Sequence, residues 1–224
     1  MRKAIVIGAG SSIDRYDHLM MLAKSSFDGV ILVCDKVLDI CLRMGVRPEK
    51  FKNYYVFTLE DFSWVWEWLK NCDCPELISL VHGPRTRKDI LERCQAMGYV
   101  IKADYWQYLD ITSNVGLMAF SYGWRRLKLD EICLIGMDHA NYKENVVFGE
   151  NTEAFNLFYQ KYYNPEFDSQ CYLNPIQQIW REAFFDYLKL APKNLKIVNC
   201  TQAGSLFGKN IICMDFARYL DGRA

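Results

Sequence analysis

Short apolar runs alternate with segments of helical period along most of the chain, and this alternation constrains the fold more than any other feature. Strands are predicted at residues 4–7, 30–34, 54–57, 77–81, 99–101, 132–135 and 196–198. Helices are predicted at residues 14–24, 36–44, 60–70, 86–97, 113–127 and 173–190. Because the strands are apolar throughout, they are typical of a parallel sheet that is covered on both faces. The sequence therefore predicts an α/β, Rossmann-like fold with a mostly parallel sheet and helices on both faces.

The regular alternation stops after residue 136. Residues 141–153 are polar without a clear period, and residues 154–163 are rich in aromatic side chains. We expect a helical insertion near the C-terminal third, at about residues 140–172, which forms a lid or a small subdomain over a site. Neither an internal repeat nor a linker rich in Pro, Gly or Ser divides the chain, so we expect one transferase domain over residues 1–224.

Composition narrows the class of protein further. The chain has 27 Lys and Arg against 27 Asp and Glu, and a zero net charge argues against a nucleic-acid binder. Apolar runs stay well short of the roughly 18 residues of a membrane span. Several of the nine cysteines lie in predicted strands, and the Cys72/Cys74 pair lacks metal-site spacing. We therefore expect a reduced, cytoplasmic protein without a membrane span, and a homo-oligomer remains open.

A glycine-rich loop follows the first predicted strand and opens the first helix. It contains Gly8, Gly10, Ser11 and Ser12. Glycines and helix N-terminal amides at this place hold phosphate groups in many α/β proteins. The third glycine of the dinucleotide fingerprint is replaced by Ile13, and the lysine of a P-loop is missing. The loop therefore favours contact with a phosphate or sugar over NAD binding, and the alternative is a tight turn with Ser11 or Ser12 as N-cap.

The ends of the second and fourth predicted strands each carry one titratable side chain. Asp35 follows the second strand, where a carboxylate can accept hydrogen bonds from a ribose or can cap the next helix. His82 follows the fourth strand, where it can serve as a general acid or base. The alternative for His82 is a loop histidine that bonds a backbone carbonyl.

Three later loops offer further polar groups at the same predicted edge of the sheet. They contribute Ser113, Asn114 and Gly116; Gly136, Asp138 and His139; and Thr201 and Gly204. The first loop provides helix N-terminal amides for an anion or nucleotide. Asp138 could bind Mg²⁺ or a sugar hydroxyl, or could orient a base beside His139. Ordinary helix capping and turn formation remain the alternatives for all three loops.

Five motifs occur in order across residues 4–220: AIVIGAGSSID, VCDKVLDICLRMGVRP, TSNVGLMAFSYGW, EICLIGMDHA and VNCTQAGSLFG. In this order they resemble the 6-hydroxymethylpterin diphosphokinase-like family, which includes archaeal pterin diphosphokinases and bacterial motility accessory factors. The layout is also similar to that of Rossmann-like bacterial sialyltransferases.

The resemblance implies a nucleotide-dependent transferase that moves diphosphate from ATP to a pterin alcohol. Its partners would be a small-molecule nucleotide donor and a small acceptor. It implies a donor pocket framed by Gly8, Gly10, Ser11, Asp35, Asn114, Gly116, Asp138, Thr201 and Gly204. Asp138, with Mg²⁺, would face the reacting group, and His82 would be the base.

The chain departs from the archaeal pterin enzymes in its acidic residues. The stretches FTLED and TSNVGLMA stand where those enzymes carry additional carboxylates suited to Mg²⁺ and ATP. This departure favours two alternatives. One is a glycosyltransferase that uses a CMP-activated sugar, with His82 or His139 as acid/base. The other is a non-catalytic module that binds a nucleotide or sugar.

Overall fold

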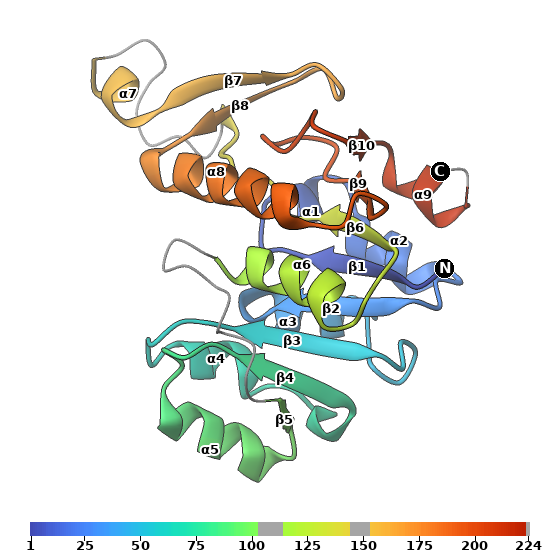
Figure 1. The fold of residues 1–224 in the computed structure, drawn as a ribbon. Coiled ribbons are helices and arrows are strands. Elements are labelled where there is room, and N and C mark those ends of the chain that lie inside the picture. The colour runs from blue at the N-terminus through green and yellow to red at the C-terminus, as the bar shows by residue number, and fades with distance from the viewer. Residues whose placement is uncertain (103–113, 144–152, 223–224) are drawn as a thin grey trace.

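Eight parallel strands build the central sheet, in the order β10-β9-β6-β1-β2-β3-β4-β5 (Figure 1). The computed structural model describes residues 1–102, 114–143 and 153–222. The strands are β1 (Lys3–Ile7), β2 (Val30–Cys34), β3 (Tyr54–Thr58), β4 (Ile78–His82), β5 (Val100–Lys102), β6 (Glu131–Ile135), β9 (Lys196–Asn199) and β10 (Ile211–Cys213). The predicted α/β class and mostly parallel sheet are confirmed.

The strand order reverses next to β1. The chain first builds β1 to β5 in one direction and then returns to place β6 on the other side of β1. Ile7 is therefore in register with Val33 of β2 on one side and with Ile135 of β6 on the other. At such a reversal the loops after neighbouring strands diverge, and ligands of open α/β sheets bind in the crevice that results.

Helices cover both faces of the sheet, as the apolar strands predict (Figure 1). On one face lie α2 (His18–Lys24), α3 (Leu38–Arg43), α4 (Val65–Leu69), α5 (Lys88–Met97) and α9 (Phe216–Leu220). On the other lie α6 (Val115–Arg125) and α8 (Pro175–Leu190). Within β1, Ile5 points to the first layer and Val6 to the second, and both are fully buried. The four residues of this strand from Ala4 to Ile7 are all apolar and buried.

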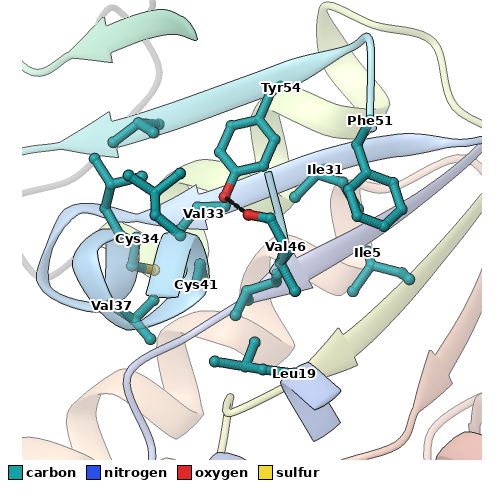
Figure 2. Packing of buried hydrophobic residues seen from close by; sticks show 14 of the residues in the cluster. Ile5, Leu19, Ile31, Val33, Cys34, Val37, Cys41, Val46, Phe51 and Tyr54 are labelled. Atoms are coloured by element: carbon teal, nitrogen blue, oxygen red, sulfur yellow. Dashed lines mark hydrogen bonds between the residues drawn. The ribbon is translucent and has the colours of Figure 1, made fainter. Parts of the chain in front are cut away.

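The core between β1–β3 and α3 shows how polar atoms are accommodated (Figure 2). The hydroxyl of buried Tyr54 donates to the carbonyl oxygen of Val46 at 3.0 Å. Cys34 and Cys41 pack in the same cluster as small apolar side chains. All nine cysteines of the chain are free thiols. A disulfide framework is thus unnecessary for this core.

Several predicted helices are shorter or divided. The first splits into α1 (Ser12–Arg15) and α2, because Asp17 takes a left-handed conformation with φ of 52°. The second begins with a 3-10 turn, η1 (Asp35–Val37), and the third shrinks to α4. A further 3-10 turn, η2 (Pro75–Leu77), precedes β4. Within the described ranges, no helix combines the length and apolar character needed to cross a membrane.

The insertion is mostly β-structure in its described part. A short helix, α7 (Glu153–Phe158), precedes an antiparallel hairpin of β7 (Gln160–Asn164) and β8 (Ser169–Leu173). The prediction of a helical insertion holds for α7 and is wrong for residues 160–173, because residues 160–164 pair with the strand that follows them. An isolated bridge between Asn141 and Tyr172 ties the hairpin to the loop after β6. That the insertion acts as a lid, and that the chain forms a single domain, remain predictions.

Candidate functional site

A cleft of about 480 Å³ opens at the carboxyl ends of β1, β2, β3 and β6, where the strand order reverses. Most of the residues predicted from the sequence line it: Gly8, Gly10, Asp35, Asn114, Gly116, Gly136, Asp138 and His139. The lining also includes residues that sequence reasoning missed, chiefly Lys36, Glu60, Trp68, Asn141, Gln177 and Trp180. The structure thus gathers four separate loops and the first turns of two helices around one space.

The glycines of the first loop bring two loops together. The N–H of Gly8 donates to Ile135 O at 2.9 Å, and the N–H of Gly10 donates to Gly136 O at 2.8 Å. A Cβ on Gly8 would collide with the carbonyl oxygen of Gly136. These two amides are therefore not free for a phosphate, because both are already bonded to the end of β6. Contact of the loop with a phosphate or sugar remains a prediction. Ala9, between them, still lines the cleft.

Asp138 is held from the side of α1. The N–H of Ser12 donates to its Oδ2 at 2.9 Å, and the Ser12 hydroxyl donates to its Oδ1. Burial raises the pKa of Asp138, while Ser12, the Tyr142 hydroxyl and the Arg15 charge oppose the rise. Since Ser12 donates to both of its oxygens, this carboxylate mainly ties the loop after β6 to the start of α1.

His139 is an uncharged, oriented ring. Asn114 uses its Oδ1 to accept from the N–H of Leu117 at 2.8 Å, so its Nδ2 is the atom 3.3 Å from His139 Nε2. An amide nitrogen only donates, so Nε2 accepts and the ring proton sits on Nδ1. Nδ1 is buried without a hydrogen-bond partner. Burial, followed by the Arg181 charge, lowers the pKa of His139 to about 4.

The side of the cleft next to β2 and β3 carries charge. Asp35 is 2% exposed; its Oδ1 accepts from the N–H of Lys36 at 2.7 Å, and its Oδ2 makes no hydrogen bond to a residue that the structure describes. Burial raises the pKa of Asp35 to about 7, and the negative charge of Glu60 adds to the rise. Thr58 and Lys36 act in the opposite direction. The carboxylate is therefore poorly compensated and gains from a cation or donor that enters the cleft.

Other predicted site residues lie away from this space. His82 is bonded through Nδ1 to Gly83 O at 3.1 Å and does not line the cleft, which is the loop-histidine alternative. Thr201 donates its hydroxyl to Ala203 O at 2.5 Å. Gly204 has φ of 80° and packs against the backbone of Asp138, so it supports the loop after β6. Ser11 is also outside the lining, and Ser113 lies outside the described residues.

The carboxylates that line the cleft differ in how well they fit a divalent cation. Among residues 1–102, 114–143 and 153–222, no three His, Cys, Asp or Glu side chains come together as metal ligands. Mg²⁺ commonly needs only one or two carboxylates, because waters and substrate phosphates complete its shell. Asp138 fits this role poorly, since Ser12 occupies both of its oxygens. Asp35 and Glu60 fit it better, because Asp35 Oδ2 has no partner and both side chains line the cleft.

Two of the missed residues come from α8, whose start has a readable signal. Asn174 caps the helix by accepting from the N–H of Gln177, and the Gln177 side chain accepts from the N–H of Asn174. The sequence Asn-Pro-Ile-Gln predicts this capping box. It places Gln177 and Trp180 three residues apart, on one face of the helix. The sequence alone predicts that these residues share a face of the helix, but it does not predict that this face lines the cleft.

The comparisons with known proteins agree with this architecture. A family model described as 6-hydroxymethylpterin diphosphokinase MptE-like matches residues 1–144. Among solved structures, the chain is similar to the MAf glycosyltransferase from Magnetospirillum magneticum AMB-1, with a TM-score of 0.70 and 13% identity. The match covers 96% of this chain and 33% of that one, so the chain spans about a third of its length. No curated protein matches the sequence.

Proposed function

The chain belongs to the 6-hydroxymethylpterin diphosphokinase MptE-like family, and from this premise we propose that it is a Mg²⁺-dependent transferase. It moves diphosphate from ATP to the hydroxymethyl group of a pterin alcohol. The alcohol oxygen bonds to the β-phosphorus of ATP, the bond from that phosphorus to the α,β-bridging oxygen breaks, AMP leaves, and the alcohol proton is released to water. The cleft at the reversal of strand order is the place of this transfer.

The observation that carries the proposal is the charge of the cleft lining. Among the described residues, the lining holds three carboxylates, Asp35, Glu60 and Asp138, and one cationic side chain, Lys36. A nucleotide triphosphate entering alone would be repelled by this surface. A divalent cation bound between the carboxylates and the phosphates is attracted by both and so offsets their mutual repulsion. This argument favours a Mg²⁺-bound donor over a phosphate held by protein cations.

The chain's own groups bind and orient the donor. Asp35 and Glu60 would hold the cation, which neutralises the charge that develops on the phosphates. The N–H groups of Val115 and Gly116 precede the first helical hydrogen bond of α6, from Met118 to Asn114, and both residues line the same cleft. They provide a second, uncharged phosphate contact. Catalysis then rests on positioning and electrostatics, with neither His82 nor His139 required as a base.

Calorimetric titration with ATP, with Mg²⁺ and with EDTA, tests the proposal together with mass spectrometry of AMP and the diphosphorylated pterin. We expect ATP to bind only with Mg²⁺, and Asp35→Asn or Glu60→Gln to weaken this binding at least tenfold. Asp61→Asn, an exposed neighbour of Glu60, is the matched control and should bind as the unmodified chain does. Equal ATP binding in EDTA, or binding of CMP alone, would overturn the proposal.

A second candidate is sugar transfer from a CMP-activated donor. It is supported by the likeness to the MAf glycosyltransferase over nearly the whole chain. CMP binding that is independent of Mg²⁺, with release of CMP from a CMP-sugar, would support it over the first proposal. Nucleotide binding without turnover of either donor would favour a non-catalytic binding module.

A further inference from the structure

The two ends of the cleft differ in chemistry. The charged end, defined by Asp35, Lys36 and Glu60, lies after β2 and β3. The uncharged end lies after β6 and at the starts of α6 and α8; it consists of Asn114, His139, Asn141, Gln177 and Trp180. β6 and β3, the outer two of the four strands that end at the cleft, are three strand spacings or about 14 Å apart. One ligand therefore meets two different environments.

Hydrogen bonds fix the polar groups of the uncharged end. Asn141 donates through Nδ2 to Gln177 Oε1 at 2.7 Å, and that oxygen also accepts from the N–H of Asn174 at 3.0 Å. This arrangement leaves Asn141 Oδ1 as an acceptor and Gln177 Nε2 as a donor. Within the described part of the chain, neither atom has a partner. An adjacent donor and acceptor match the edge of a heterocyclic base.

Aromatic rings form the wall beside these amides. The His139 ring lies 6.4 Å from the Trp180 ring and meets the Phe184 ring edge-on at 6.1 Å. His139 is neutral near pH 7, because burial lowers its pKa to about 4. Among the described residues that line the cleft, Asp138 is the carboxylate on this side, and Ser12 donates to both of its oxygens. The uncharged end therefore offers planar apolar surface and neutral hydrogen-bonding groups.

We infer that the uncharged end binds the base of the donor nucleotide, with the phosphates extending toward Asp35 and Glu60. The inference rests on the proposed function for the nucleotide donor. The ligand is the donor because a nucleotide joins a neutral ring to a charged phosphate chain, which match the two ends of the cleft. A pterin alcohol has only the neutral ring. In this orientation His139 positions the base and is not an acid or base of the reaction.

Nucleosides provide the test, because they carry the base without phosphates and need no Mg²⁺. We expect adenosine to bind the full chain in EDTA, and Trp180→Leu to weaken this binding about tenfold. His139→Asn should also weaken it, and Asn tolerates the left-handed backbone of this position, φ 44°. Asp35→Asn and Glu60→Gln should leave adenosine binding unchanged. Trp64→Leu, a half-exposed tryptophan outside the cleft lining, is the matched control.

Several outcomes would overturn the inference. These are no nucleoside binding at millimolar concentration, equal binding by Trp180→Leu and the unmodified chain, or loss of binding in Glu60→Gln. Binding of a pterin alcohol, but not of nucleosides, to the Trp180 end would also overturn it. Cytidine in parallel distinguishes a CMP donor from an ATP donor. Nucleoside binding without diphosphate transfer would reject the proposed reaction and leave the location of the base intact.

Discussion

Ser12 occupies both carboxylate oxygens of Asp138: its N–H donates to Oδ2 and its hydroxyl to Oδ1. The two residues are 126 positions apart in the chain, and both are buried. The pair joins the start of α1 to the loop after β6, which forms the floor of the cleft. A carboxylate at a strand end, typical of a metal ligand, is here a structural tie.

Ser12→Ala should destabilise the protein by about 1–3 kcal/mol, because it leaves a buried carboxylate oxygen without its donor. Urea denaturation at pH 7 measures the loss. Ser11→Ala is the control, since the Ser11 side chain makes no capping hydrogen bond, and we expect a change within about 0.5 kcal/mol. Equal effects of the two substitutions would contradict the structural tie.

Gly136→Ala should destabilise the protein more than Gly208→Ala. Both glycines have positive φ, 63° and 73°, so both substitutions carry a similar backbone strain. Only at Gly136 does an added Cβ collide with a neighbour, the carbonyl oxygen of Gly8, whereas nothing lies within 4 Å at Gly208. The difference between the two losses of unfolding free energy therefore measures the close contact between the loops. We expect Gly136→Ala to lose about 1–3 kcal/mol more than Gly208→Ala.

His18 should make the fold sensitive to acid. Its Nε2 donates to Gln202 Oε1 at 3.2 Å, and its Nδ1 is buried without a partner. Burial lowers the pKa of His18 from 6.5 to about 4, although Gln202, Asp215 and Asp17 pull it upward. Between these values the unfolded chain binds a proton that the folded chain does not, so stability falls as pH falls.

His18→Phe tests this pH dependence, because the ring can keep its edge-on contact with Phe216 and cannot titrate. Compared with the unmodified chain, the variant should lose about 2 kcal/mol less stability between pH 7 and pH 5. Denaturation curves at several pH values provide the measurement. Parallel curves for the two proteins would show that His18 is not the responsible group.

Asp35 should act in the opposite direction in metal-free protein. Burial raises its pKa from 3.8 to about 7, so between these values the folded chain binds a proton that the unfolded chain does not. Stability therefore falls as pH rises through this window. In EDTA, Asp35→Asn should stabilise the protein at pH 8 by roughly 2–4 kcal/mol and change it little at pH 4. Equal effects at the two pH values would contradict this prediction.

The cleft shows where sequence reasoning reached its limit. Gly8, Asp35 and Asn114 were predicted at strand or helix ends, and the parallel sheet brings them to one edge. His82 was predicted by the same rule, but it ends β4. In the sheet, β4 lies three strands from β1, where the strand order reverses. A strand-end rule gives the edge of the sheet and does not give the position along that edge.

The sequence by itself determined the local structure: strands such as β1 and β6, apolar on both sides, and the glycines that let their loops touch. These follow from the period of the side chains and from backbone sterics, which act over a few residues. Only the tertiary structure decided that the Gly8 and Gly10 amides bond to the end of β6, that Ser12 donates to both oxygens of Asp138, and that Gln177 and Trp180 line the cleft. Hydrogen-bond partners and burial depend on which distant segments meet, and the order of strands in the sheet sets those meetings.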